Sequence, residues 1–166
     1  MIKLKRSLRR LKTNAPRITL QEGSGRIMKK VLFVCVENSC RSQMAQGYAR
    51  ELGKGILEAY SAGSRPSGEI NPLALKVMQE QGIGLSGYKS KGFNELPVKN
   101  FDYVITLGCQ DTCPLFPAKE HIQWQIEDPK GKELEYFRFV REKIKSHVEE
   151  LIRKVSAGEA LNKVGG

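Results

Sequence analysis

The sequence lacks any run of apolar residues long enough to cross a membrane. A membrane-spanning helix requires about 18 or more consecutive apolar residues. Lysine and arginine interrupt every apolar run before Val31, so the amino terminus also lacks the apolar segment of a secretory signal. These absences predict a cytoplasmic chain that has no membrane as a partner.

Cysteine is also scarce. Four cysteines in 166 residues are too few for the disulfide framework of a small secreted protein. In a reducing cytoplasm, grouped cysteines more often bind a metal or carry out thiol chemistry than form structural bridges. The four are grouped as two spaced pairs, Cys35 with Cys40 and Cys109 with Cys113. The pattern therefore predicts a chemical site.

Acidic residues are almost absent from the first thirty positions. Residues 1–30 hold ten basic residues and one acidic residue, whereas residues 31–166 hold 18 basic and 17 acidic residues. The formal net charge of +10 thus arises in the amino-terminal segment, and the rest of the chain is nearly neutral. Because a charge favours binding only at the surface that carries it, we expect no nucleic acid as a partner of the main body.

Residues 1–29 form a basic amino-terminal extension. A faint helical pattern of leucines is followed by Pro16 and by a Gly-Ser-Gly run. We expect this segment to be disordered or loosely helical. A start site assigned upstream of Met28 is one interpretation, and a surface-binding or targeting segment is the other. Residues 30–166 have the size of a single catalytic domain.

From residue 30 onward, short β-rich apolar runs alternate with amphipathic helical patterns. A continuous apolar run such as that from Val31 to Val34 is typical of a parallel strand covered on both faces. Apolar residues spaced by three and four predict helices. The expected strands cover 31–34, 56–61, 101–107 and 121–124, and the expected helices cover 42–52, 72–82 and 133–155.

This alternation predicts an α/β fold, a four-stranded parallel sheet flanked by helices on both faces, of the doubly wound type. In such sheets, ligands bind outside the carboxyl ends of the strands. A binding site is therefore expected among the residues that follow Val34, Tyr60, Leu107 and Trp124.

The segment after the first strand has the chemistry of an anion site. It reads Cys-Val-Glu-Asn-Ser-Cys-Arg-Ser from Cys35 to Ser42 and leads into a helix. Backbone N–H groups in such a loop converge on one point, and the helix amino terminus adds positive partial charge. Arg41 adds a planar fork that matches a tetrahedral oxyanion, and the same donors should stabilise a thiolate nucleophile at Cys35. The expected oxyanion-binding residues are Glu37, Asn38, Ser39, Cys40, Arg41 and Ser42.

The run Val31-Leu-Phe-Val-Cys-Val-Glu-Asn-Ser-Cys-Arg-Ser-Gln-Met-Ala resembles the signature of the low-molecular-weight protein tyrosine phosphatase superfamily. Thioredoxin-coupled arsenate reductases share the fold of this superfamily. Tyr60-Ser61-Ala62-Gly63 and Asp128-Pro129 are further landmarks, and the resemblance covers most of residues 30–155.

The resemblance implies roles for five residues. Cys35 is implied as the nucleophile, Arg41 as the clamp on the oxyanion, and Asp128 as the general acid. Asn38 and Ser42 are implied to hold the loop and to stabilise the thiolate. Asp128 follows the expected fourth strand, so it should lie on the same rim of the sheet as Cys35, where a carboxylic acid can protonate a leaving oxygen.

Two further thiols favour a reductase over a phosphatase. Cys109 and Cys113 follow the expected third strand, which places them on the same rim as Cys35. Hydrolysis does not need extra thiols, whereas reduction of arsenate takes two electrons from thiols and leaves a disulfide. Tyrosine phosphatases of this fold also tend to carry aromatic residues after the Asp-Pro, where this chain has Lys130-Gly131.

These features predict an arsenate reductase with thioredoxin as its external reductant and with no bound cofactor or metal. The expected ligand is arsenate or a phosphate-like oxyanion, and the chain is expected to be a monomer. In the expected relay Cys35 attacks arsenate, Cys109 attacks Cys35, and Cys113 attacks Cys109; the spacing leaves the order of the last two cysteines open. A tyrosine phosphatase with a phosphocysteine intermediate is the alternative.

Four cysteines in two spaced pairs also permit a structural zinc site, which stoichiometric zinc in the purified protein would reveal. In such a site Arg41 would lie beside a dianionic thiolate cluster, and the guanidinium would have no function there. Gln46 stands where some members of the superfamily carry a glutamate that helps to bind potassium, so we expect no potassium site.

Overall fold

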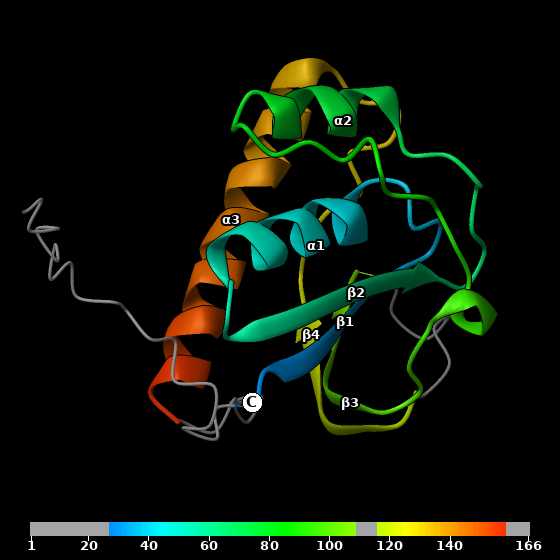
Figure 1. Cartoon of the computed structure of the whole chain (residues 1–166). Helices are drawn as coiled ribbons and strands as arrows, with labels where there is room; N and C mark the ends of the chain where they lie inside the picture. The colour runs from blue at the N-terminus through cyan, green and yellow to red at the C-terminus, as the bar shows by residue number, and fades with distance from the viewer. Residues whose placement is uncertain (1–26, 109–115, 159–166) are drawn as a thin grey trace, which may run out of the picture.

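The computed structural model describes residues 27–108 and 116–158, and the rest of the chain lies outside this description. Four strands form one parallel sheet in the order β2-β1-β3-β4 (Figure 1). The predicted α/β fold with a four-stranded parallel sheet is confirmed. In chain order the elements are β1 (Lys29–Cys35), α1 (Arg41–Leu52), β2 (Leu57–Gly63), α2 (Pro72–Gln79), the 3₁₀ helix η1 (Phe93–Glu95), β3 (Phe101–Leu107), β4 (Ala118–Trp124) and α3 (Leu134–Ser156).

β1 is an inner strand and positions the candidate site. Its central residues, from Val31 to Val34, are almost completely buried, as a strand covered on both faces requires. Lys29 pairs with Leu57 and Cys35 with Gly63 on the β2 side, and β3 pairs along the other side. Cys35 therefore lies at the carboxyl edge of the sheet, between two neighbouring strands. Most of the predicted extension 1–29 lies outside the described residues.

The three α-helices of the described residues contribute to the apolar core on one face of the sheet. Met44 of α1, Val77 of α2 and Ile144 of α3 belong to the same buried cluster as Phe33 of β1. Figure 1 shows α2 lying over α1 and against α3, so that α1 and α3 separate it from the sheet.

The opposite face of the sheet differs from the expectation of helices on both faces. Leu32 and Val34 of β1 pack there against Phe93 and Leu96, and no α-helix contributes to this cluster within residues 27–108 and 116–158. The connection from β2 to β3 carries α2 on the first face and then crosses to the second face, which η1 and the residues after it cover, as a right-handed crossover requires. Pro97 favours an extended conformation of Leu96, which ends η1 after one turn.

β4 is an edge strand and begins at Ala118, three residues before the predicted start at 121. Its side chains alternate between half-buried and exposed positions up to the buried Trp124, so the strand has no continuous apolar run. The remaining strands and helices are confirmed, with ends shifted by up to three residues.

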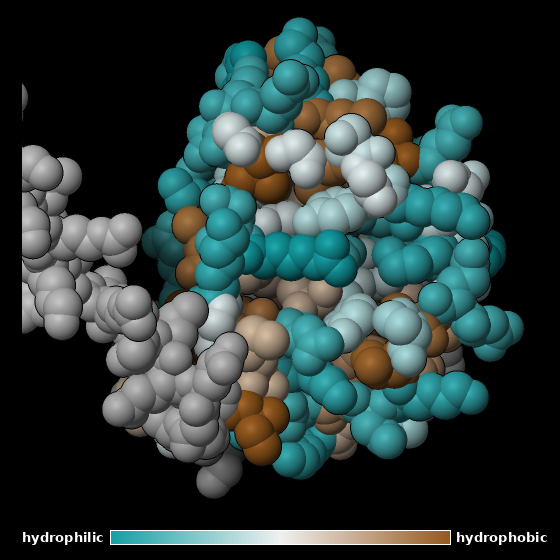
Figure 2. Space-filling model, viewed as in Figure 1, coloured by the Kyte–Doolittle hydropathy of each residue, from teal (hydrophilic) through white to brown (hydrophobic). Residues whose placement is uncertain are grey.

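The face of the molecule seen in Figure 2 is mostly hydrophilic. Apolar atoms reach the surface around α2, where Leu73 and Leu75 are only half-buried. None of the helices in the described part of the chain is both long enough and apolar enough to span a membrane.

Glu80, at the carboxyl end of α2, connects this helix to α3. Its carboxylate accepts hydrogen bonds from Arg138 Nη2 at 2.6 Å and from Arg141 Nη1 at 2.8 Å. The hydrogen bond from Arg138, supported by Arg141, lowers the pKa of Glu80 to about 2. Because the folded state favours the ionised carboxylate, this contribution to stability is present above the ordinary pKa of glutamate and is lost as the pH falls toward 2.

We therefore expect Glu80→Gln to lower the free energy of unfolding at pH 7 and to remove one of the two carboxylates that pair with Arg141, the other being Glu142. The difference from the wild type should shrink as the pH falls from the ordinary glutamate pKa, about 4.3, toward the folded value of about 2. Urea unfolding followed by circular dichroism at a series of pH values measures this. Glu69→Gln, which changes an exposed carboxylate, is the control; a Glu80→Gln difference that is constant with pH would contradict the assignment.

Candidate active site

The candidate active site begins where β1 ends. Cys35 is the last residue of this strand and is 3% exposed, and a five-residue loop, 36–40, leads from it into α1. The first N–H groups of an α-helix have no partners inside the helix. The side chain of Cys40 at the N-cap does not accept a hydrogen bond from them. The amino terminus of α1 therefore offers backbone donors and positive partial charge to an anion.

A chain of hydrogen bonds reaches the sulfur of Cys35. Asn38 Nδ2 donates to Ser42 Oγ at 2.7 Å, and Ser42 Oγ lies 2.9 Å from Cys35 Sγ. Because the Ser42 oxygen already accepts from Asn38, its own proton is free to point at the sulfur. A hydroxyl that donates to sulfur favours the thiolate over the thiol. The structure thus brings together the three residues that the resemblance implied for the nucleophile and its support.

Asn38 holds the loop in an unusual backbone conformation. Its φ is +51°, in the left-handed region that few residues other than glycine adopt, and its side chain is completely buried. The side-chain oxygen accepts hydrogen bonds from Gln43 Nε2 at 2.8 Å and from the Lys91 backbone N–H at 3.0 Å. Both ends of the Asn38 amide are therefore satisfied, which fixes the loop before any anion binds.

β2 and the segment before η1 also hold the loop in place. A Cβ atom at Gly63 would lie 2.5 Å from the Val36 carbonyl oxygen and 2.8 Å from the Asn38 nitrogen, so only glycine permits this approach. Ser90 Oγ donates to the Glu37 carbonyl oxygen at 2.7 Å. The anion-binding loop is thus anchored to two segments that are distant in the sequence.

Arg41 is buried at the first position of α1 and points toward the loop after β4. Its Nη1 donates to the Ile126 carbonyl oxygen at 3.0 Å, and its Nη2 lies 3.5 Å from Asp128 Oδ2. Gly108, at φ +74°, leaves the space that the guanidinium occupies, because a side chain there would collide with Nη1. One nitrogen is thus fixed by a carbonyl, which orients the planar group.

Asp128 lies at the rim, as predicted, with half of its side chain exposed. The Lys130 backbone N–H donates to Asp128 Oδ1 at 3.0 Å, so the carboxylate is oriented from its own loop. Arg41, Gly108 and Asp128 line one cleft of about 650 Å³, together with Val36, Gln125, Ile126, Glu127 and Lys143. The clamp and the acid therefore face the same space.

Cys40 lies in the same loop but is not a candidate nucleophile. Burial raises the pKa of its thiol to about 12. Its sulfur lies 3.6 Å from Ser39 Oγ. Because its thiol is protonated and buried, Cys40 can support an anion only through its backbone N–H. The same backbone contribution is expected of Ser39. The remaining cysteines, Cys109 and Cys113, lie outside the described residues, so the relay and the four-cysteine zinc site both stay predictions.

The carboxylate of Glu37 does not face an anion as a ligand. Lys130 Nζ lies 2.6 Å from Glu37 Oε1, which joins the loop after β1 to the loop after β4. This hydrogen bond and the charge of Glu37 raise the pKa of Lys130. Among the predicted oxyanion-binding residues, Glu37 is therefore expected to contribute through its backbone.

Residues 30–163, which include Cys35, Arg41 and Asp128, match the family model described as low molecular weight phosphotyrosine protein phosphatase. The chain belongs to this family. The resemblance of its loop sequence to this superfamily is thereby confirmed.

Proteins similar to this family member include a Synechocystis protein named glutaredoxin arsenate reductase, 45% identical over 132 residues, which are 78% of this chain and 100% of the relative. A solved structure described as an arsenate reductase in the phosphate binding state has a TM-score of 0.70 at 44% identity and covers 77% of this chain and 99% of its own. The thioredoxin-dependent arsenate reductase of Corynebacterium glutamicum has a TM-score of 0.65 at 31% identity and covers 80% of this chain and 64% of its own.

Several residues of the family site were not predicted from the sequence. Gln43 and Lys91 hold Asn38, whereas Gly108 and the Ile126 carbonyl position Arg41. A glycine directly after a predicted strand is the signal that could have indicated Gly108. Ile126 contributes its backbone carbonyl oxygen, and the type of a side chain gives no indication of such a contact.

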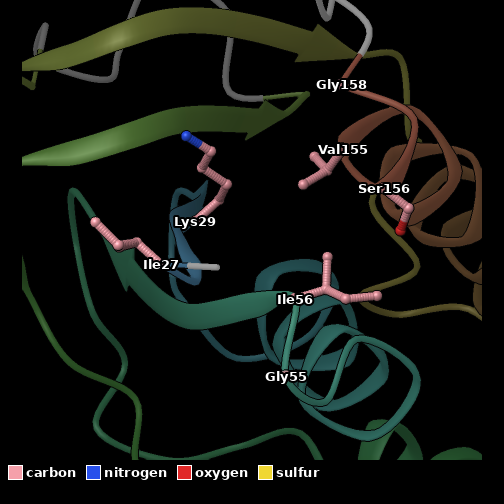
Figure 3. Close-up of a pocket in the computed structure, with 7 residues that line it drawn as sticks. All are labelled: Ile27, Lys29, Gly55, Ile56, Val155, Ser156 and Gly158. Carbon is pink, nitrogen blue, oxygen red and sulfur yellow. The ribbon is translucent and has the colours of Figure 1, made fainter. Parts of the chain in front are cut away.

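A second hollow, of about 340 Å³, lies at the opposite edge of the sheet (Figure 3). It is lined by Ile27 and Lys29 at the start of β1, by Gly55 and Ile56 before β2, and by Val155, Ser156 and Gly158 at the end of α3. Ligands of open parallel sheets bind at the carboxyl ends of the strands. This hollow lies at the amino ends and is lined by none of the predicted site residues, so the family site is the one at Cys35.

Proposed function

We propose that the chain is an arsenate reductase that reduces arsenate to arsenite through a cysteine relay. The observation that carries the proposal is Cys35 Sγ at 2.9 Å from Ser42 Oγ, at the start of a helix whose first residue is Arg41. A thiolate there can attack the central atom of a tetrahedral oxyanion that the helix terminus and the guanidinium hold. The similarity to arsenate reductases at 44–45% identity supports this substrate.

The first step forms a bond between Cys35 and arsenic. The thiolate attacks arsenate, and one arsenate oxygen leaves as water after taking a proton from Asp128. The carboxylate that remains is next to Arg41 Nη2, which stabilises its charge. Arsenic is still oxidised in this thiol–arsenate adduct.

The second step transfers two electrons. A thiolate of Cys109 attacks the Cys35 sulfur, and the sulfur–arsenic bond breaks with its electron pair on arsenic, which leaves as arsenite. The product is a disulfide between Cys35 and Cys109. Cys113 then attacks Cys109, which frees Cys35 as a thiolate and leaves a disulfide between Cys109 and Cys113. Cys109 acts first in this proposal because it follows β3 more closely in the sequence.

Thioredoxin is proposed as the reductant of the final disulfide. A dithiol protein can reduce a disulfide by attack and resolution, and it leaves this chain with three free relay thiols. A relative is named for thioredoxin and another for glutaredoxin, so both reductants belong in the assay. We further propose that the enzyme is a cytoplasmic monomer that needs no bound cofactor.

Single-turnover experiments with cysteine variants test the relay. Cys113→Ser should release about one arsenite per protein and stop with Cys35 and Cys109 joined, whereas Cys109→Ser should stop at the adduct. Cys40→Ser should turn over and is the matched control. Arsenite release and the intact mass of the unreduced protein are the measurements. Full multiple turnover by Cys109→Ser or Cys113→Ser would refute the relay.

Phosphatase activity is the second candidate function, since Cys35, Arg41 and Asp128 are also the groups that hydrolysis through a phosphocysteine needs. The family match and the pairing of Arg41 with Asp128 favour this activity as a side reaction. Both Cys109→Ser and Cys113→Ser should keep whatever phosphatase activity the wild type has.

Asp128→Asn should lower arsenate turnover by about 10²-fold or more, because hydroxide is a poor leaving group without a proton. The loss should be smaller for p-nitrophenyl phosphate, whose leaving group departs without protonation. Glu127→Gln, which changes the neighbouring carboxylate, is the control. Arsenate turnover by Asp128→Asn within threefold of the wild type would remove Asp128 from its role as general acid.

A further inference from the structure

An ion pair connects the loop that follows the nucleophile, Cys35, to the loop that carries the general acid, Asp128. Glu37 lies two residues after Cys35, and Lys130 lies two residues after Asp128. Their charged atoms, Glu37 Oε1 and Lys130 Nζ, are 2.6 Å apart. The pair therefore joins the nucleophile loop to the acid loop.

Both partners sit on backbone that is fixed by other contacts. The Glu37 carbonyl accepts from Ser90 Oγ at 2.7 Å and from the Ser67 backbone N–H at 3.1 Å. The Lys130 backbone N–H donates to Asp128 Oδ1 at 3.0 Å. The ion pair is thus a bridge between two anchored loops. Its side chains are 33% and 57% exposed, so it lies at the surface rather than inside the site.

The general acid, Asp128, sets the direction in which the leaving group extends, and this direction brings the leaving group beside the Glu37–Lys130 bridge. The leaving oxygen must face Asp128 in order to receive its proton, so any organic group on that oxygen extends past the acid loop. In arsenate the leaving oxygen carries nothing larger than hydrogen. In an aryl phosphate it carries a ring, which extends from Asp128 toward the rim of the cleft, where Glu37 follows Val36 and Lys130 follows Asp128 by two residues.

We propose that the Glu37–Lys130 bridge determines specificity: it admits a free tetrahedral oxyanion and hinders an oxyanion ester with a bulky leaving group. The ester must separate the two charges or tilt away from Asp128, whereas the free oxyanion leaves the bridge closed. An exposed ion pair is weak enough to open, so the bridge lowers ester turnover without abolishing it. The inference extends the proposed function, because it explains why a phosphatase-like site would prefer arsenate.

Lys130 has a second effect through charge. The Glu37 carboxylate lies close to a site that binds anions, and its repulsion of them is offset by the ammonium group. Lys130→Gln alone leaves this negative charge uncompensated and should weaken the binding of inorganic phosphate. Adding Glu37→Gln removes the charge and should restore that binding relative to Lys130→Gln. A purely structural role of the bridge would not give this recovery.

The test compares the inhibition constant of inorganic phosphate with the KM of p-nitrophenyl phosphate in the full-length wild type and in Glu37→Gln/Lys130→Gln. The inhibition constant of phosphate divided by the KM of the ester should be about tenfold higher in the double variant than in the wild type, which means relatively tighter binding of the ester. The kcat/KM for the ester should rise in parallel. The α3 ion pair changed by Lys145→Gln/Glu149→Gln is the matched control and should leave the ratio as in the wild type.

An unchanged ratio in the double variant would overturn the proposal, and so would a Lys130→Gln effect that Glu37→Gln does not reverse. Neither measurement requires arsenate turnover. A wild type that fails to reduce arsenate would therefore refute the proposed function, while the phosphate and ester constants would still decide whether the bridge selects between ligands.

Discussion

Replacing Cys35 with serine is expected to abolish arsenate reduction and aryl phosphate hydrolysis together. The nucleophile in both reactions is a thiolate, and a serine hydroxyl at the same place remains protonated and unreactive. Ser42 Oγ, which accepts from Asn38 and lies 2.9 Å from the Cys35 sulfur, offers a proton to the atom at position 35 rather than removing one. Arsenite release and p-nitrophenolate release from the purified variant should both equal the uncatalysed background.

Phosphate binding by the same variant separates chemistry from folding. Isothermal titration with inorganic phosphate should still detect an intact loop, since Arg41 and the α1 terminus remain. Cys40→Ser is the control for the loss of a thiol in the same loop, and it should retain both activities because burial keeps that thiol protonated. Measurable turnover by Cys35→Ser would show that another residue is the nucleophile.

Arg41→Lys is expected to lower kcat/KM for arsenate by about 10²–10³-fold, the loss that follows removal of one preorganised donor to a developing oxyanion. A guanidinium offers two parallel donors in one plane, whereas an ammonium is a point charge. In the structure the Ile126 carbonyl fixes Nη1, and Gly108 provides the space for it. Lysine cannot fill this arrangement and also present a fork to the oxyanion.

Arg65→Lys is the matched control, because Arg65 is exposed and its backbone N–H, not its side chain, bonds the loop at the Val36 carbonyl. Initial rates at several arsenate concentrations would separate the loss of binding from the loss of rate. Arsenate turnover by Arg41→Lys within a few fold of the wild type would mean that the backbone donors of the loop suffice.

The part of the site that is local in the sequence was predictable. Cys35, Arg41 and Ser42 are placed by the passage from a strand through a short loop into a helix, and each of these elements has its own sequence pattern. For Asp128, only the edge of the sheet at which it lies was predictable, because parallel strands bring the residues that follow them to one edge.

The part that depends on tertiary contacts was not predictable. The Ile126 carbonyl reaches Arg41 across 85 positions, and Lys130 reaches Glu37 across 93. Such pairings follow from the register of the sheet and the path of the loops, which no local pattern specifies. On the second face of the sheet, where the expectation was a helical covering, one turn of 3₁₀ helix, η1, packs instead, because Pro97 favours an extended conformation of Leu96.

The most direct test of the account is arsenate-dependent oxidation of NADPH by the wild type with thioredoxin and thioredoxin reductase, run beside hydrolysis of p-nitrophenyl phosphate. We predict saturable NADPH oxidation with an equal amount of arsenite formed, and its loss when thioredoxin is omitted. A parallel assay with glutathione, glutaredoxin and glutathione reductase identifies the reductant. A wild type that ignores arsenate with both reductants, yet hydrolyses p-nitrophenyl phosphate briskly, would contradict the reductase and establish the phosphatase in its place.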